Sequence, residues 1–167
     1  IVYAIAILLS WRFILRLQRM LSPYNIEKTI QNVKQNGGSG GIDGVQMQDI
    51  AVYIKENWTR IKEQIFTRKY KPKPVRRVEI EKENGGVRLL GIPCLIDRVI
   101  QQAMIQVLQS VFEPIFSDYS YGFRPNRSAE DAVRQAQIYM SEGCTHVVDL
   151  DLSKFFDTIN HDLLMNK

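Results

Sequence analysis

Residues 147–162 read VVDLDLSKFFDTINHD, and this stretch decides how the rest of the chain is interpreted. Asp149 and Asp151 alternate with apolar residues, so the two-residue repeat of a strand would place both carboxylates on one face. A buried carboxylate is tolerated where it is paired, hydrogen-bonded or bound to a cation, and hard cations prefer oxygen ligands. The stretch therefore predicts a buried strand with an acidic face. The alternative is that one aspartate caps the turn at Ser153.

Helical patterns occupy most of the chain before this stretch. Each is a repeat of apolar residues bounded by a capping residue, a glycine or a proline. Five helices are predicted in this way. The first begins at Ser22-Pro23, the second contains Met47, Ile50 and Ile54, and the third contains Ile61 and Ile65. The fourth runs between Pro93 and Pro114, and the fifth begins at Ser128. The run GGSGGIDG, residues 37–44, is predicted to be a flexible loop, because its glycines favour turns.

The central segment combines a hairpin signature with most of the excess positive charge. Val75–Glu81 and Val87–Ile92 flank Glu83-Asn84-Gly85-Gly86, which has the composition of a hairpin turn. The chain has 22 Lys and Arg against 18 Asp and Glu, a net charge of +4, whereas residues 60–90 alone carry 10 − 4 = +6. Such a cationic segment favours a polyanionic partner, and a solvated charged face is the alternative.

Two further features limit the class of protein. Cys94 and Cys144 are far apart and lack histidine or cysteine partners at metal-ligand spacing, which argues against a zinc site and favours free thiols in a reducing cytoplasm. Residues 1–9 are apolar, but a membrane span needs ~20 such residues, and no signal-peptide pattern is present. We expect residues 1–21 to form a helical extension that packs or self-associates, without stable membrane association. Membrane contact, or an imprecise start of the sequence, is the alternative.

The quoted stretch resembles the first palm motif of reverse transcriptases, an aspartate at a strand end followed five residues later by an aromatic. Three more segments share the resemblance: KYKPKPVRRVEI (69–80), GGVRLLGIPCLIDRVIQQA (85–103) and SYGFRPNRS (120–128). Together they resemble the group II intron-encoded reverse transcriptase and maturase family from about Leu21 to Lys167. The implied fold is α+β: helix-rich fingers with a β-hairpin over residues 22–144, and the first palm strand of a right-hand polymerase, truncated, over 145–167.

The resemblance implies roles for the candidate catalytic residues. Asp151 would be the catalytic aspartate that binds two Mg²⁺ ions, and Leu152 would offer its carbonyl to one of them. Lys82 and Arg88 would grip the triphosphate of the incoming deoxynucleotide, with an exposed surface pair as the alternative. Phe156 would stack beneath the sugar, with a core aromatic as the alternative.

RNA contacts are expected along the basic segment and in residues 120–128. The residues expected to meet RNA are Lys71, Lys73, Arg76, Arg77, Arg124 and Arg127. For Arg124 and Arg127, structural pairing with Asp118 or Asp131 is an equal alternative. One departure from the family is Glu81, which stands in place of a proline and adds negative charge beside Lys82.

The implied function is RNA-directed DNA synthesis by two-metal nucleotidyl transfer. The implied partners are structured intron RNA as template and a DNA primer, and the implied location is a ribonucleoprotein in the bacterial cytoplasm. In the family's motif order, the later palm aspartates and the thumb follow residue 167. We therefore expect residues 1–167 alone to leave the ions unbound, to be inactive, and to form a homodimer through exposed apolar surface. The alternatives are an RNA-binding maturase module without polymerase activity, a retron-like stand-alone reverse transcriptase, and an α/β domain with no nucleic-acid role.

Overall fold

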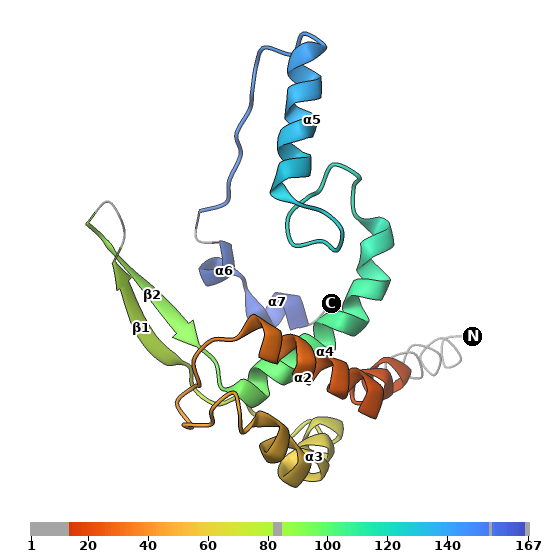
Figure 1. Cartoon of the computed structure of the whole chain (residues 1–167), viewed down its shortest axis with the longest axis vertical. Coiled ribbons are helices and arrows are strands. Elements are labelled where there is room, and N and C mark those ends of the chain that lie inside the picture. Colours follow the sequence, from red (N-terminus) through yellow and green to blue (C-terminus); the bar gives the residue numbers. More distant parts are fainter. Residues whose placement is uncertain (1–13, 82–84, 154, 166–167) are drawn as a thin grey trace. The chain divides into compact units, whose positions relative to one another are not determined.

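The computed structural model describes residues 14–81, 85–153 and 155–165 (Figure 1). The chain divides into two compact units, the first unit Ile1–Phe116 and the second unit Ser117–Lys167. Residues 14–20 are helical. The first unit then contains α2 (Pro23–Asn36), α3 (Ile50–Phe66), β1 (Arg76–Glu81), β2 (Val87–Ile92), α4 (Leu95–Phe112) and the 3-10 turn η1 (Glu113–Ile115). The second unit contains α5 (Ala129–Ser141), α6 (Phe155–Thr158) and α7 (His161–Met165). The predicted helix-rich α+β class is confirmed.

The hydrophobic core of the first unit lies where α2 and α3 pack against α4. Leu95 and Val99 of α4 and Ile50 of α3 have no exposed surface. Burying one such side chain stabilises the fold by about 1.5–3 kcal/mol. The buried apolar residues are Met20, Leu21, Ile26, Val33, Ile50, Ile54, Ile61, Cys94, Leu95, Ile96, Val99, Ile100, Ala103 and Val107.

Helix α3 corrects one boundary expected from the sequence. The two helices predicted around residues 47–54 and 61–65 form a single helix, Ile50–Phe66. Its buried residues Ile50, Ile54 and Ile61 are spaced by four and seven positions, so they lie on one continuous stripe of an α-helix. No residue between them breaks the helix, because the intervening segment lacks both glycine and proline.

A buried polar network joins α2 to α4. The side-chain amide of Gln106 donates to the Oδ1 atom of Asn25 and to the hydroxyl of Thr29, both at 2.8 Å. Asn25 in turn donates from Nδ2 to the carbonyl of Ala103 at 3.1 Å and to that of Met20 at 2.8 Å. Because an unpaired buried polar group costs free energy, these bonds fix the register of the two helices.

The glycine-rich loop is held against α4, which corrects the prediction of a flexible loop. A Cβ atom on Gly41 would lie 2.5 Å from the Cα atom of Cys94, so the two backbones touch. Arg98 of α4 donates to the carbonyl of Gly37 at 2.5 Å and to that of Ser39 at 3.4 Å. Glycine is therefore needed here for close backbone approach, which sequence composition alone does not distinguish from flexibility.

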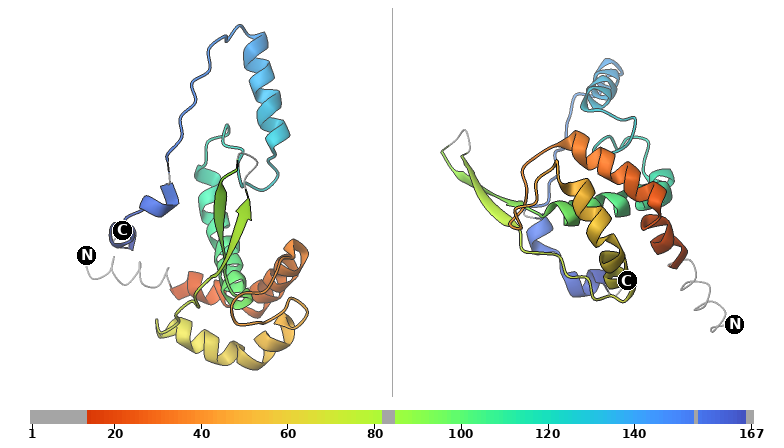
Figure 2. Two further views of the ribbon diagram at one scale, coloured as in Figure 1. Left: turned by 90° about the vertical axis from the view of Figure 1, so that its left-hand side faces the viewer. Right: turned by 60° about the horizontal axis from the view of Figure 1, so that its bottom comes forward.

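Strands β1 and β2 form the predicted hairpin, an antiparallel ribbon that extends from the helices of the first unit (Figures 1 and 2). The register runs from Arg76 opposite Ile92 to Glu81 opposite Val87. Residues 82–84 at the turn lie outside the described residues. Most residues of the ribbon are exposed, so both of its faces are available for binding.

Local hydrogen bonds define α5 in the second unit. Ser128 and Asp131 form the predicted capping box: the Ser128 hydroxyl accepts from the Asp131 N–H at 3.2 Å, and Asp131 accepts from the Ser128 N–H at 3.0 Å. The hydrogen bond from the Ser128 hydroxyl lowers the pKa of the Asp131 carboxyl. Gly143, with φ 98°, follows the helix end as predicted.

The predicted buried strand around residues 146–152 is not observed. Residues 144–152 form neither helix nor strand, and Val147, Val148 and Leu150 are 93%, 81% and 89% exposed. A strand is stabilised by hydrogen bonds to a neighbouring strand, and among the described residues the only sheet is the β1–β2 ribbon. No described helix is both long and apolar enough to cross a membrane.

Candidate functional site

The register of the ribbon separates its charged residues onto two faces. Residues directly opposite each other in an antiparallel pair share a face, and neighbours along a strand alternate. Arg76 and Arg88 therefore lie on one face, which we call the arginine face, together with Val78, Ile80, Leu90 and Ile92. Arg77 lies on the opposite face with Glu79 and Glu81. The sequence prediction groups Arg76 with Arg77, whereas the structure groups Arg76 with Arg88.

Lys71 and Lys73, both expected to bind RNA, have different surroundings. Lys71 is exposed. The ammonium of Lys73 lies 3.1 Å from Oδ2 of Asp43, whose side chain is only 7% exposed. This hydrogen bond raises the pKa of Lys73. The charge of Lys73 is therefore matched by a carboxylate of the glycine-rich loop, whereas Lys71 presents its charge to solvent.

A buried carboxylate, Asp97, holds the segment that leads into β1. The hydroxyl of Tyr70 donates to Oδ1 of Asp97 at 2.6 Å, and the backbone N–H of Lys73 donates to Oδ2 at 3.3 Å. Asp97 is 3% exposed, and burial together with this hydrogen bond raises the pKa of Tyr70. Sequence reasoning missed Asp97, although an acidic residue between the apolar positions Ile96 and Val99 was the available signal.

The carboxylates of Asp149 and Asp151 are exposed. Asp149 and Asp151 lie in the irregular segment before α6, and Leu152 is 69% exposed. Members of the reverse transcriptase family use divalent metal ions, which are bound by several oxygen ligands. No group of three or more His, Cys, Asp or Glu side chains able to hold a metal ion occurs in the part of the chain that the structure describes.

Two expected nucleotide-binding groups fall outside what the structure describes. Lys82 lies outside the described residues, and so does the side chain of Phe156, whose backbone belongs to α6. Arg88 is described and is exposed on β2. His161 begins α7, and Asn160 caps that helix by accepting from the N–H of Leu163 at 3.0 Å.

Arg124 and Arg127 organise the loop before α5. Arg124 donates to the carbonyls of Ser117 and Ser120 at 2.5 and 3.0 Å. Arg127 donates to the carbonyl of Asp118 at 3.0 Å, and its guanidinium lies 3.6 Å from the Asp118 carboxylate and 5.7 Å from the centre of the Tyr121 ring. Arg127 thus makes the alternative pairing with Asp118, and RNA contact by either arginine stays a prediction.

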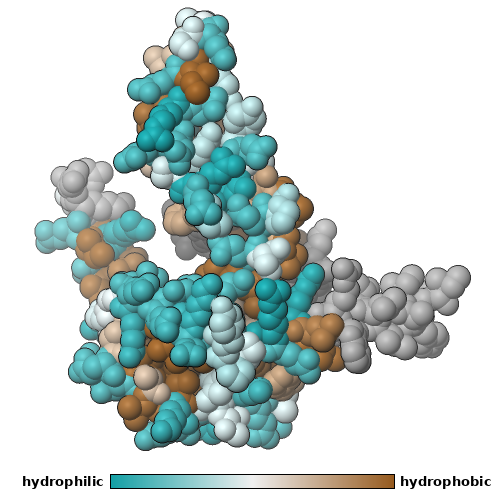
Figure 3. Space-filling model, turned by 45° about the vertical axis from the view of Figure 1, so that its right-hand side comes forward, coloured by the Kyte–Doolittle hydropathy of each residue, from teal (hydrophilic) through white to brown (hydrophobic). Residues whose placement is uncertain are grey.

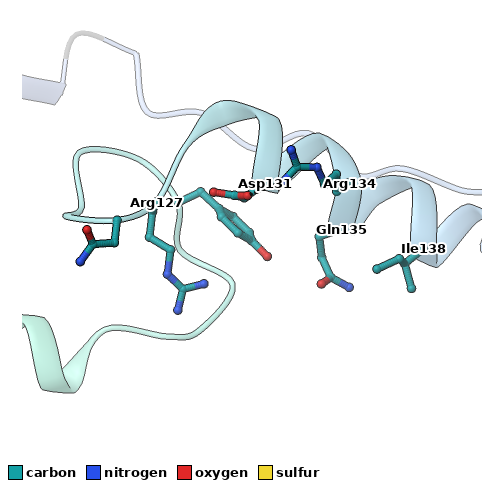
Figure 4. A pocket seen from close by; sticks show the side chains of 7 residues that line it. Arg127, Asp131, Arg134, Gln135 and Ile138 are labelled. Carbon is teal, nitrogen blue, oxygen red and sulfur yellow. Dashed lines mark hydrogen bonds and ion pairs between the residues drawn. The ribbon is translucent and has the colours of Figure 1, made fainter.

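A shallow hollow of about 340 Å³ lies between this loop and α5 (Figure 4). Its cations are balanced by acids, because Arg134 lies 2.9 Å from Asp131 and Arg127 pairs with Asp118. The hollow therefore has no excess positive charge for an anion. Its lining residues are Tyr121, Asn126, Arg127, Asp131, Arg134, Gln135 and Ile138.

Residues 80–167 match the family model described as reverse transcriptase (RNA-dependent DNA polymerase). This match covers more than half of the chain and includes Arg88 and Asp151. The chain therefore belongs to the reverse transcriptase family.

Its relatives include a group II intron-encoded protein, which confirms the resemblance drawn from the sequence. LtrA of Lactococcus lactis subsp. cremoris, named as such a protein, is 35% identical over 136 residues, which cover 81% of this chain and 22% of LtrA. Protein YkfC of Escherichia coli (strain K12) is 39% identical over 129 residues, covering 75% of this chain and 34% of YkfC. The chain thus spans about a third or less of the length of these relatives.

A solved structure supports the fold. The partial Cas6-RT-Cas1–Cas2 complex contains a chain that superimposes with a TM-score of 0.50 at 21% sequence identity. The match covers 90% of this chain and 24% of that chain. At this level of identity the likeness concerns the fold alone.

Proposed function

We propose that this chain supplies the fingers, residues 22–144, and the start of the palm, residues 145–167, of an RNA-directed DNA polymerase of the group II intron type. The observation that carries the proposal is that one family match spans both Arg88 on the ribbon and Asp151 before α6. The intron-encoded bacterial relative LtrA supports intron RNA as the template. A location in the bacterial cytoplasm, a DNA primer and assistance to splicing are further parts of the same proposal.

The arginine face of the ribbon is the proposed contact surface for substrate phosphates. Arg88 and Lys82 would bind the triphosphate of the deoxynucleotide, since cations on a ribbon can close over a polyanion. Arg76 shares a face with Arg88 and would meet the RNA backbone. Arg77, beside Glu79 and Glu81, is the weaker candidate of the adjacent pair, because the acids repel phosphate.

Asp151 is the proposed catalytic carboxylate. Together with the carbonyl of Leu152 it would contribute ligands to Mg²⁺, an ion that prefers carboxylate oxygens and substrate phosphates. Phe156 is proposed to stack beneath the nucleotide sugar. That the 167-residue chain alone lacks polymerase activity stays a prediction.

A chimera tests this proposal. Residues 21–167 replace the corresponding part of a reverse transcriptase with measurable RNA-templated DNA synthesis, and primer extension is measured. We expect the chimera to be active, Asp151→Asn to reduce synthesis to background, and the matched variant Asp149→Asn to keep it. Equal activity of all three proteins, with normal folding, would remove Asp151 from the catalytic role.

An RNA-binding role of the basic segment is the second candidate, and the exposed charge of Lys71 favours it. RNA binding by the 167-residue chain is measured over a salt series. Each lost phosphate contact lowers the slope of log K against log salt by about 0.7–0.9. We expect the double variant Lys71→Gln/Arg76→Gln to bind RNA more weakly and with a flatter salt slope. The single variant Arg77→Gln is expected to change both the affinity and the slope by less. An unchanged slope in the double variant would indicate a solvated face.

The homodimer remains a prediction. Apolar side chains of α4, among them Ile105, Leu108 and Phe112, are 37–51% exposed, and Figure 3 shows apolar residues interrupting the hydrophilic surface. Such surface favours association. Sedimentation velocity over a range of protein concentrations tests it, and a monomer at every concentration would contradict it.

A further inference from the structure

Lys73 is held at both its backbone and its side chain. Pro72 and Pro74 flank it and carry no N–H, so Lys73 offers the single backbone donor of these three residues. That N–H donates to the buried Asp97 at 3.3 Å, and the ammonium donates to Asp43 at 3.1 Å. One residue therefore connects the first turn of α4 to the glycine-rich loop.

The second strand of the ribbon leads into the same first turn of α4. β2 ends at Ile92, and Cys94, the residue before α4, touches Gly41 of the loop. Arg98 binds two further carbonyls of the loop, at residues 37 and 39. These contacts link the glycine-rich loop and residues 70–74 to the start of α4. They lie beside the start of β1 and the end of β2, the end of the hairpin that we call the root of the ribbon.

We infer that Lys73 is a positioning residue: its ion pair with Asp43 fixes the glycine-rich loop to the root of the ribbon and so sets the direction in which the arginine face points. Lys73 belongs to the basic segment by sequence, but its charge is used within the protein. The positioning of Arg76 and Arg88 for phosphate rests on the proposed function, whereas the link between loop and ribbon root does not.

Hydrogen exchange of the free 167-residue chain tests the link without any RNA. The backbone amides of residues 37–45 and 70–75 are followed in Lys73→Met, in Asp43→Asn and in the double variant. We expect roughly 1.5- to fivefold faster exchange in each single variant, because the Lys73 side chain is 46% exposed and solvent screening limits such a pair to about 0.2–1 kcal/mol. The double variant is expected to exchange no faster than either single variant, because both remove the same interaction.

Two matched variants separate positioning from RNA contact. Lys73→Arg keeps the ion pair and is expected to restore slow exchange. Lys71→Met removes an exposed cation two residues away and is expected to leave exchange unchanged while lowering the salt slope of RNA binding by about one phosphate contact. Lys73→Met is expected to keep the wild-type slope.

The inference is overturned if Lys73→Met leaves exchange at the wild-type rate, or if it lowers the salt slope as Lys71→Met does. Failure of the wild-type chain to bind RNA would count against the proposed function alone, since the exchange experiment would still decide the role of the Asp43–Lys73 pair.

Discussion

The first and second units contrast in how they are held together. Every described residue that is buried belongs to the first unit, where α2 and α3 cover α4. The second unit has no buried residue among those described, and Val133, Met140 and Leu150 are 57%, 70% and 89% exposed. The contrast teaches that local hydrogen bonds can shape a helix and a loop without creating a core.

The second unit illustrates which interactions remain when a core is absent. The Ser128–Asp131 capping box and the arginine-to-carbonyl bonds of the loop lie between residues close in sequence. Exposed interactions of this kind contribute little individually, about 0.2–1 kcal/mol for an ion pair. In this unit the apolar residues Val147, Val148 and Leu150 remain exposed.

Truncating one buried leucine has the largest expected effect on this contrast. Leu95→Ala in the first unit removes a side chain with no exposed surface and is expected to cost about 2–5 kcal/mol of unfolding free energy. Leu150→Ala in the second unit removes an exposed side chain and is expected to change it by less than about 0.5 kcal/mol. Urea unfolding followed by circular dichroism measures both. A comparable loss in the two variants would mean that residue 150 is buried in solution.

Removing the centre of the polar network between α2 and α4 has an intermediate expected effect. Gln106→Ala leaves Asn25 and Thr29 with fewer partners, and a buried group left unsatisfied costs about 1–3 kcal/mol. Arg134→Ala in the second unit, which removes exposed ion pairs, is the control and is expected to stay within about 0.5 kcal/mol. Equal urea midpoints for Gln106→Ala and the wild type would show that water replaces the network.

The smallest expected effect is a decline in the unfolding free energy of the first unit at alkaline pH, to which Tyr70 contributes. The pKa of Tyr70 is raised in the folded chain, so the unfolded chain loses this proton first as the pH rises. The stabilisation is present below the ordinary tyrosine value of about 10 and declines above it. Lys73, whose pKa is also raised, acts with the same sign.

The variant Tyr70→Phe removes the tyrosine contribution. It is expected to lose about 1 kcal/mol at neutral pH, from the lost hydrogen bond to Asp97, and to show a shallower decline between pH 10 and 11. Urea midpoints measured over the pH series give both quantities. Parallel curves for the two proteins would exclude Tyr70 as a source of the alkaline decline.

Features that depend on neighbouring residues were predictable from the sequence. The start of α2 at Ser22-Pro23, the capping box at Ser128 and the two strands of the ribbon all follow from short-range rules of capping, proline geometry and turn composition.

Features that depend on distant partners were not predictable. Asp97 meets Tyr70 across 27 positions, and Arg98 meets Gly37 across 61. The strand expected at residues 146–152 requires a partner strand, and alternation alone cannot supply one. Arg124 and Arg127 show a different limit: their partners are close in sequence, but an arginine has the same appearance in sequence whether it binds a carbonyl or a phosphate.

The two faces of the ribbon have a consequence for how a nucleic acid approaches. Within the paired residues 76–81 and 87–92, the arginine face carries two positive charges and no acid, whereas the opposite face carries one positive and two negative charges. This arrangement is a dipole across the thickness of the sheet. A polyanion is attracted to one side and repelled from the other, so the ribbon exerts a torque on an approaching strand before any contact forms. Orientation is thereby selected at a distance of about one Debye length, ~8 Å at physiological salt.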